Sequence, residues 1–166
     1  MKNINKLVPD TSIIIENLVS KKIESNEFSV KEIIIHEAVL SELEHQANVG
    51  KEIGHLGLEE IKKLQALSKS KKFILSFSGK RPDASQIRHA SLGEVDALIR
   101  DLAFELKATL ITGDKVQSKV AEAKSMDVIY VEPLIQRKQL TIEKYFDETT
   151  MSLHIRENTI PYAKRG

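Results

Sequence analysis

The sequence predicts an α/β protein, a three-layer α/β/α sandwich around a central parallel sheet, followed by a C-terminal extension. Short apolar runs typical of buried strands alternate with amphipathic stretches typical of helices. With 166 residues, 41% of them hydrophobic, the chain can bury one real core but not two. The pattern changes at Pro133, so we expect a domain at residues 1–132 and an extension at residues 133–166.

The first strand and helix are predicted on either side of one acidic residue. The apolar stretch KLVP predicts a short buried strand at residues 6–9. TSIIIENLVSKK then predicts a helix over residues 11–22, with Asp10, Thr11 or Ser12 as its N-cap.

The next elements repeat the alternation of strand and helix. Three consecutive isoleucines in EIIIH, residues 32–36, predict a strand covered on both faces. Helical spacing returns at residues 38–48, and Gly50 provides a stop. Residues 57–70 predict a further amphipathic helix, and KFILSFSG, residues 72–79, a third strand.

Two more strand and helix pairs complete the predicted domain. SLGE, residues 91–94, has the Ser-x-x-Glu form of a capping box and precedes the amphipathic residues 95–106. ATLITGD, residues 108–114, predicts a strand that ends in a Gly-Asp turn. A helix at residues 115–125 and a strand at residues 127–131 follow.

The extension has the pattern of a strand. Met151, Leu153 and Ile155 alternate with polar residues, which predicts one buried face. The chain then ends with no evident later strand to pair with this one. We therefore expect the chain to be a fragment of a longer protein.

Composition excludes several classes of protein. The absence of cysteine excludes disulfides and thiolate metal sites, so we expect a cytoplasmic protein. The apolar runs are far shorter than the roughly 20 residues that span a bilayer, so no membrane association is expected. Formal charge is uneven, at −3 over residues 1–53, +5 over residues 54–90 and −1 over residues 91–166.

Four acidic residues are predicted to meet at one edge of the sheet. Asp10 and Asp114 each follow a strand, and ligands of parallel sheets gather beyond the carboxyl ends of the strands. Asp96 in a helix first turn and Glu42 on a helix can join them. Two carboxylates at 4 Å repel by roughly 4 kcal/mol at an effective dielectric near 20, so such a cluster requires a cation or protonation. Oxygen ligands alone favour Mg²⁺ or Mn²⁺.

Each acid also has an ordinary structural interpretation. Asp10 can be an N-cap and Asp114 a turn residue after glycine. Asp96 can complement a helix dipole and pair with Arg100 at i+4, and Glu42 can be one of several surface glutamates.

Four motifs in order resemble those of the PIN-domain nucleases. They are VPDTS, AVLSELEHQ, GEVDALIRDLAFEL and LITGD, and the resemblance covers roughly residues 6–131. It implies a PIN-like fold and a nuclease activity with Mg²⁺ or Mn²⁺. The residues that it implies for the site are the acidic tetrad Asp10, Glu42, Asp96 and Asp114, with Ser12 and Thr112 as orienting hydroxyls.

A longer resemblance is to the N-terminal region of archaeal PIN-domain ATPases. FDETTMSLHIRENTIPYAKRG is similar to the segment that joins the PIN domain to the P-loop ATPase. No phosphate loop is present, because Ile74 and Arg81 occupy the positions that a motif around Gly79-Lys80 would need as Gly and Ser/Thr. The resemblance implies homo-oligomers, a hexamer in a parent with the ATPase, and leaves monomer or dimer open for the isolated domain.

The resulting hypothesis is a metal-dependent nuclease domain that hydrolyses phosphodiester bonds of single-stranded RNA or DNA, as the N-terminal part of a larger ATPase. Alternatives are a non-cleaving nucleic-acid-docking or oligomerisation module of that ATPase, and a free-standing toxin ribonuclease. A phospho-receiver lacks the required adjacent acids and the Lys-Pro pair. Candidate phosphate contacts, or alternatively a merely solvated face, are Lys62, Lys63, Lys69, Lys71, Lys72, Lys80, Arg81 and Arg88.

Overall fold

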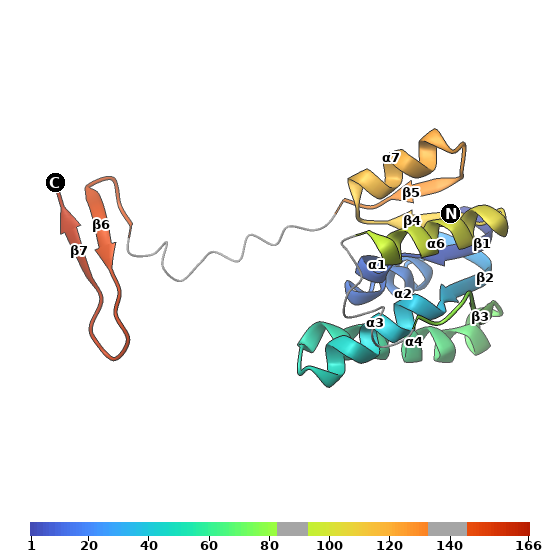
Figure 1. The fold of residues 1–166 in the computed structure, drawn as a ribbon, viewed down its shortest axis with the longest axis horizontal. Coiled ribbons are helices and arrows are strands. Elements are labelled where there is room, and N and C mark those ends of the chain that lie inside the picture. The colour runs from blue at the N-terminus through green and yellow to red at the C-terminus, as the bar shows by residue number, and fades with distance from the viewer. Residues whose placement is uncertain (83–92, 133–145) are drawn as a thin grey trace. The chain divides into compact units, whose positions relative to one another are not determined.

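The computed structural model describes residues 1–82, 93–132 and 146–166 (Figure 1). The chain divides into two compact units, Met1–Glu132 and Pro133–Gly166. Each unit is described by itself.

The first unit is built on one five-stranded parallel sheet. Its order is β3-β2-β1-β4-β5, so the first strand of the chain lies in the middle. All four pairings are parallel, and the predicted α/β class with a central parallel sheet is confirmed. The strands are β1 Lys2–Pro9, β2 Phe28–His36, β3 Ile74–Ser78, β4 Thr109–Thr112 and β5 Val128–Tyr130.

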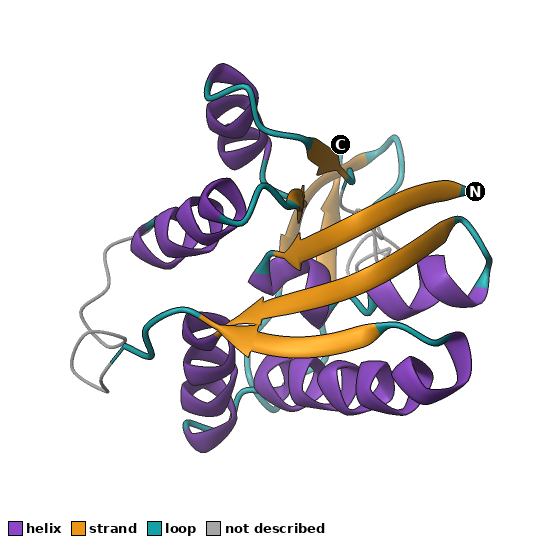
Figure 2. Cartoon of the chain, turned by 90° about the vertical axis from the view of Figure 1, so that its right-hand side faces the viewer, coloured by secondary structure: helices purple, strands orange, loops and turns teal. Residues whose placement is uncertain are grey.

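Helices cover both faces of this sheet, which lies between them in Figure 2. The chain moves outward from β1 to β3 and then returns to β4, and right-handed crossovers place the helices of the two halves on opposite faces. Helices α6 and α7 pack on β1, β4 and β5, while α3 packs on α4 and also contacts α6. The helices are α1 Thr11–Ile15, α2 Leu18–Glu24, α3 Glu37–Asn48, α4 Glu52–Lys71, α6 Glu94–Glu105 and α7 Lys115–Ala123.

The core lies between the sheet and the helices on each side. Ile33, Ile34 and Ile35 are 0%, 3% and 0% exposed although consecutive residues of a strand point to opposite faces. Both faces of β2 are therefore covered, as the isoleucine run predicted.

The predicted helix over residues 11–22 is in fact two helices. Asn17 between α1 and α2 has a φ of 56°, in the left-handed region, which interrupts the helical hydrogen bonding. Asparagine adopts this conformation more readily than most residues.

The start of α6 also differs from its prediction. The helix begins at Glu94 with Gly93 at the N-cap, whereas the capping box predicted Glu94 as the third helical residue. Ser91, the predicted cap, lies outside the described residues.

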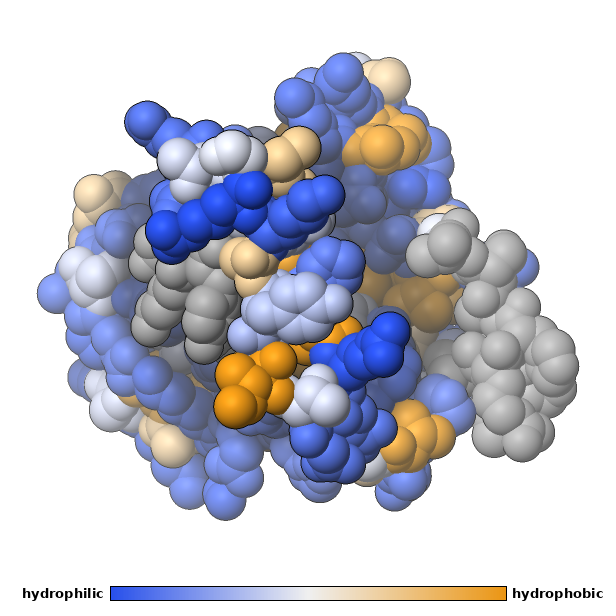
Figure 3. Space-filling view, turned by 90° about the vertical axis from the view of Figure 1, so that its left-hand side faces the viewer, coloured by the Kyte–Doolittle hydropathy of each residue, from blue (hydrophilic) through white to orange (hydrophobic). Residues whose placement is uncertain are grey.

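The second unit contains an antiparallel hairpin of β6 (Thr150–His154) and β7 (Tyr162–Arg165). The expectation that the first of these strands has no partner was wrong, because Tyr162–Arg165 pairs with it. The His154 and Tyr162 rings stack across the pair at 4.7 Å. Met151 is 67% exposed, so the predicted buried face is not formed within this unit. Figure 3, coloured by hydropathy, shows hydrophobic residues (orange) on the surface among hydrophilic ones (blue).

None of the helices in the described ranges is long and apolar enough to cross a membrane.

Candidate functional site

Two neighbouring strands bring the first two predicted acids to the same edge of the sheet. Pro9, the last residue of β1, lies opposite Ile111 of β4. The Asp10 backbone N–H donates to the Ile111 carbonyl at 2.9 Å, so the pairing extends to the residue after the strand. Asp114 follows the end of β4 by two residues. The edge at which these strands end is visible from the arrowheads in Figure 2.

Asp10 lies at the N-cap position of α1 but its carboxylate does not cap the helix. Its Oδ2 atom instead accepts hydrogen bonds from the Thr112 hydroxyl at 2.8 Å and the Ser12 hydroxyl at 3.1 Å. The side chain is directed to the neighbouring strand, and Asp10 is only 3% exposed. The simple N-cap interpretation therefore does not account for this carboxylate.

Asp114 is held by the start of α7. Its Oδ1 atom accepts from the backbone N–H groups of Val116 at 2.6 Å and Gln117 at 3.0 Å, which makes it a helix N-cap. The Thr112 hydroxyl, which donates to Asp10, also accepts from the Asp114 backbone N–H at 3.0 Å. One threonine thus links the two acids.

Glu42 and Asp96 approach this edge from two helices. Glu42 lies on α3, and its Oε2 atom accepts from the Thr11 hydroxyl at 2.9 Å. Asp96 lies in the first turn of α6. Thr11, directly after Asp10, therefore connects the first acid to the third helix.

The charges of the four acids act on one another. Burial raises the pKa of Asp10, and the Glu42 charge raises it further. Burial and the Asp96 charge raise the pKa of Glu42. Burial, followed by the charges of Asp10 and Asp114, raises the pKa of Asp96, whereas Arg100 lowers it. The four side chains therefore share one electrostatic environment.

The chemistry of these donors fits a hard divalent cation, since they are carboxylates flanked by hydroxyls. Burial is the main cause of the raised pKa values of Asp10, Glu42 and Asp96, and neighbouring carboxylate charges add to it, so a bound cation would favour the ionised forms. Within residues 1–82, 93–132 and 146–166, however, no three His, Cys, Asp or Glu side chains converge closely enough to hold an ion. The acids are thus close enough to interact without meeting at one point.

Sequence reasoning named Ser12 and Thr112 but missed Thr11 as a partner of Glu42. The only feature of the sequence that could have indicated Thr11 is its position directly after Asp10. The suggested ion pair between Asp96 and Arg100 is absent from the described residues, although the Arg100 charge reaches Asp96.

Some of the basic residues between positions 54 and 90 form ion pairs, and others lie away from the acids. Lys63 pairs with Glu24 at 2.8 Å, and Arg81 pairs with Glu44 and Glu37. Lys62 pairs with Glu59 at 3.6 Å within the same helix, whereas Arg88 lies outside the described residues.

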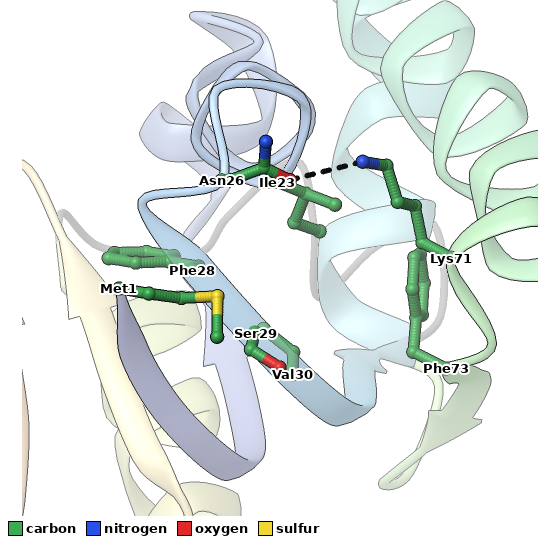
Figure 4. Close-up of a pocket in the computed structure, with 8 residues that line it drawn as sticks. All are labelled: Met1, Ile23, Asn26, Phe28, Ser29, Val30, Lys71 and Phe73. Carbon is green, nitrogen blue, oxygen red and sulfur yellow. Dashed lines mark hydrogen bonds between the residues drawn. The ribbon is translucent and has the colours of Figure 1, made fainter.

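Lys69, Lys71 and Lys72 lie at the end of α4, just before β3. They are therefore at the amino edge of the parallel sheet, opposite the acids. A cavity of about 100 Å³ lies at that edge, and its lining includes Asn26 and Lys71 (Figure 4). Lys71 Nζ donates to Asn26 Oδ1 at 3.2 Å. Lys80, just after β3, lies at the acidic edge.

Comparison with known proteins agrees with this architecture. The PIN-domain family model matches residues 7–123. A KH and PIN-domain containing protein of Methanocaldococcus jannaschii is 40% identical over 161 residues, 97% of this chain and 25% of that protein. The Holliday junction branch migration ATPase PINA of Sulfolobus acidocaldarius is 37% identical over 160 residues, 96% of this chain and 29% of that protein.

A solved structure gives the same result for the fold. A domain of a functionally unknown protein from Methanocaldococcus jannaschii matches with a TM-score of 0.74 and 38% identity, covering 77% of this chain and 91% of that one. The chain spans less than a third of the length of the two curated relatives. From the family model and the relatives together, the chain belongs to the PIN-domain family, whose members are generally nucleases.

Proposed function

We propose that this chain is a metal-dependent nuclease domain that hydrolyses phosphodiester bonds of single-stranded RNA or DNA. The site residues are Asp10, Glu42, Asp96 and Asp114. The observation that carries the proposal is the set of hydrogen bonds at the carboxyl edge of the sheet that joins Asp10 to Asp114 through Thr112 and holds Glu42 on Thr11, beside the charge of Asp96. A bound Mg²⁺ or Mn²⁺ would supply an activated water and offset charge on the phosphate oxygens.

The chain's own residues hold the acids in place for that role. The Thr112 and Ser12 hydroxyls fix one oxygen of Asp10, and the start of α7 fixes one oxygen of Asp114. Asp114 Oδ2 makes no hydrogen bond with the described residues. Asp10 and Asp114 are therefore proposed as the direct ligands, because elements that end at a strand edge position them most firmly.

Glu42 and Asp96 are proposed as additional ligands, which bind an ion directly or through water. Thr11 holds one oxygen of Glu42, so its other oxygen can contact a second ion or a water molecule. Asp96 lies in the first turn of α6 and can bind directly or through water. Raised pKa values mean that protons compete with a metal ion for both side chains.

The place of the domain in a longer protein is part of the same proposal. The relatives match this chain along almost its whole length but are more than three times as long, and one of them is named as an ATPase. We infer that this chain functions as the N-terminal part of such a protein, in homo-oligomers.

A second candidate function is a docking module that binds nucleic acid without cutting it. It is favoured by the observation that, among the described residues, no three acidic side chains converge on one point.

Titration of Mn²⁺ against labelled single-stranded RNA and DNA separates the two candidates. Asp10→Asn is the test variant. Asp101→Asn is the matched control, because Asp101 lies on α6 but is exposed and paired with Lys124 at 3.1 Å. Cleavage by the unmodified chain and by Asp101→Asn, but not by Asp10→Asn, supports the nuclease. Equal background in all three proteins, with oligonucleotide binding retained, supports the docking module.

A further inference from the structure

Arg100 lies on α6, one helical turn after Asp96. The helix packs on β1, β2 and β4 and contacts α7. Arg100 is half-buried, and its charge lowers the pKa of Asp96. Its positive charge therefore acts on the acidic site.

One nitrogen of the Arg100 guanidinium is buried and unpaired. Its Nε atom is buried without a hydrogen-bond partner, and no hydrogen bond or ion pair joins Arg100 to any described residue. Other cations near these helices are used, since Arg81 pairs with Glu37 and Glu44 and Lys124 pairs with Asp101. A buried donor without a partner costs free energy, and such groups are rare in folded proteins.

The neighbouring helix shows the same deficit. Gln117, one turn into α7 from Asp114, is 3% exposed, and both polar atoms of its side-chain amide lack a partner. Long side chains on a helix lean toward its N-terminus, which for both α6 and α7 is the edge that carries the acids. The unpaired donors thus lie on the two helices that position Asp96 and Asp114.

An anionic acceptor would match the positive charge of Arg100, provided that it tolerates the nearby carboxylates. A phosphate meets these conditions once metal ions offset the acids, and guanidinium groups bind phosphate oxygens with paired hydrogen bonds. We propose that Arg100 binds a phosphate oxygen of the nucleic-acid substrate beside the carboxylates, with Gln117 supporting the arrangement. This inference rests on the proposed function for the identity of its ligand.

The test measures binding separately from cleavage. A fluorescent single-stranded oligonucleotide is titrated with the 166-residue chain, with Ca²⁺ in place of Mn²⁺, and its anisotropy is followed. We expect Arg100→Gln to weaken binding by about tenfold or more, which is the scale of a charge-assisted hydrogen bond. The affinity of Arg100→Lys for the oligonucleotide should lie between those of the unmodified chain and Arg100→Gln, because lysine keeps the charge but lacks the planar guanidinium.

Lys124→Gln is the matched control, since it removes one positive charge from the same pair of helices at a residue already paired with Asp101. It should change binding less than about twofold, in keeping with the small contribution of exposed charges. Thermal melts of all variants identify any that do not fold, in which case Arg100→Lys carries the test.

A second measurement tests the alternative that Arg100 only compensates the charge of Asp96. Mn²⁺ binding is measured by calorimetry in the absence of nucleic acid. If Arg100 only compensates Asp96, Arg100→Gln tightens Mn²⁺ binding and leaves oligonucleotide affinity unchanged, which overturns the inference. Weaker oligonucleotide binding with equal or tighter Mn²⁺ binding supports it.

The two proposals can fail separately. Cleavage that Arg100→Gln retains in full, with unchanged affinity, removes the inference but not the nuclease. Oligonucleotide binding that depends on Arg100, in a chain that never cleaves, removes the nuclease but not the inference.

Discussion

Thr112 is the residue whose replacement most directly tests the construction of the site. Its hydroxyl is fully buried, donates to Asp10 at 2.8 Å and accepts from the Asp114 backbone N–H at 3.0 Å. Thr112→Val keeps the shape of the side chain and removes both hydrogen bonds. Asp10 is 3% exposed, so water cannot readily replace the lost donor.

The magnitude follows from these two bonds. A hydrogen bond to a charged group contributes about 1.5–3 kcal/mol and one between neutral groups about 1 kcal/mol, so Thr112→Val should lower the free energy of unfolding by about 2.5–4 kcal/mol. Thr112→Ser keeps the hydroxyl and loses one methyl group, which should cost about 1 kcal/mol.

Urea denaturation of the metal-free chain at pH 7 measures both values, with an unchanged m-value showing that only stability has changed. The deficit of Thr112→Val should shrink as the pH falls. The hydroxyl stabilises the ionised form of Asp10, so its loss raises the pKa of Asp10 further in Thr112→Val, and the deficit shrinks as the pH falls from that higher pKa to the pKa of Asp10 in the unmodified chain.

Thr109→Val is the control, because Thr109 lies at the other end of β4 and donates to Asp127 rather than to Asp10. It should destabilise the chain without altering Mn²⁺ affinity, whereas Thr112→Val should weaken that affinity as well. A valine variant no less stable than the serine variant would refute the reasoning.

Three further predictions concern metal, pH and backbone. Saturation with Mn²⁺ at about 100 times its dissociation constant should stabilise the chain by about 2.7 kcal/mol in thermal melts at pH 7, and by less at pH 5, where protons occupy the acids. Glu60 is fully buried against Ser20 and burial raises its pKa, so the folded state binds its proton more readily than the unfolded state. The stability of the unmodified chain relative to Glu60→Gln, from urea titrations, should therefore rise as the pH falls from 7 toward 5, and a flat difference would contradict this. Gly79→Ala should cost well over the roughly 1 kcal/mol of backbone strain expected for Gly93→Ala, because both have positive φ but only at Gly79 does a Cβ meet another group, the His36 ring at 2.2 Å. Equal melting temperatures for the two alanine variants would contradict that comparison.

The order of strands and helices was predictable because burial imposes a period on the sequence. The run of isoleucines at 33–35 predicted cover on both faces, and all three side chains are buried. Asp10 and Asp114 were predicted to share an edge from their places after two parallel strands, and β1 and β4 are indeed neighbours. The periodicity of apolar residues therefore predicts the order of the elements even when the residues that each side chain contacts are unknown.

Features that depend on partners were not predictable in this way. The apolar spacing continues through Asn17, so nothing in the pattern indicates the break between α1 and α2. The four residues of β7 are all exposed and show no alternation that would mark a strand. Arg100 stands four residues after Asp96, the spacing of an ion pair, yet makes none with the described residues. The spacing of residues along a helix shows which side chains can contact one another, but it does not show which of these contacts form.

The strand order also bears on how the protein is synthesised. Asp10 and Thr112 are 102 residues apart and meet only when β4 has docked beside β1. Closing so long a loop is entropically costly and tends to slow folding. A nascent chain that still lacks β4 has neither Asp114 nor the hydroxyl that orients Asp10. The arrangement of acids at this edge therefore forms only after translation has passed most of the first unit.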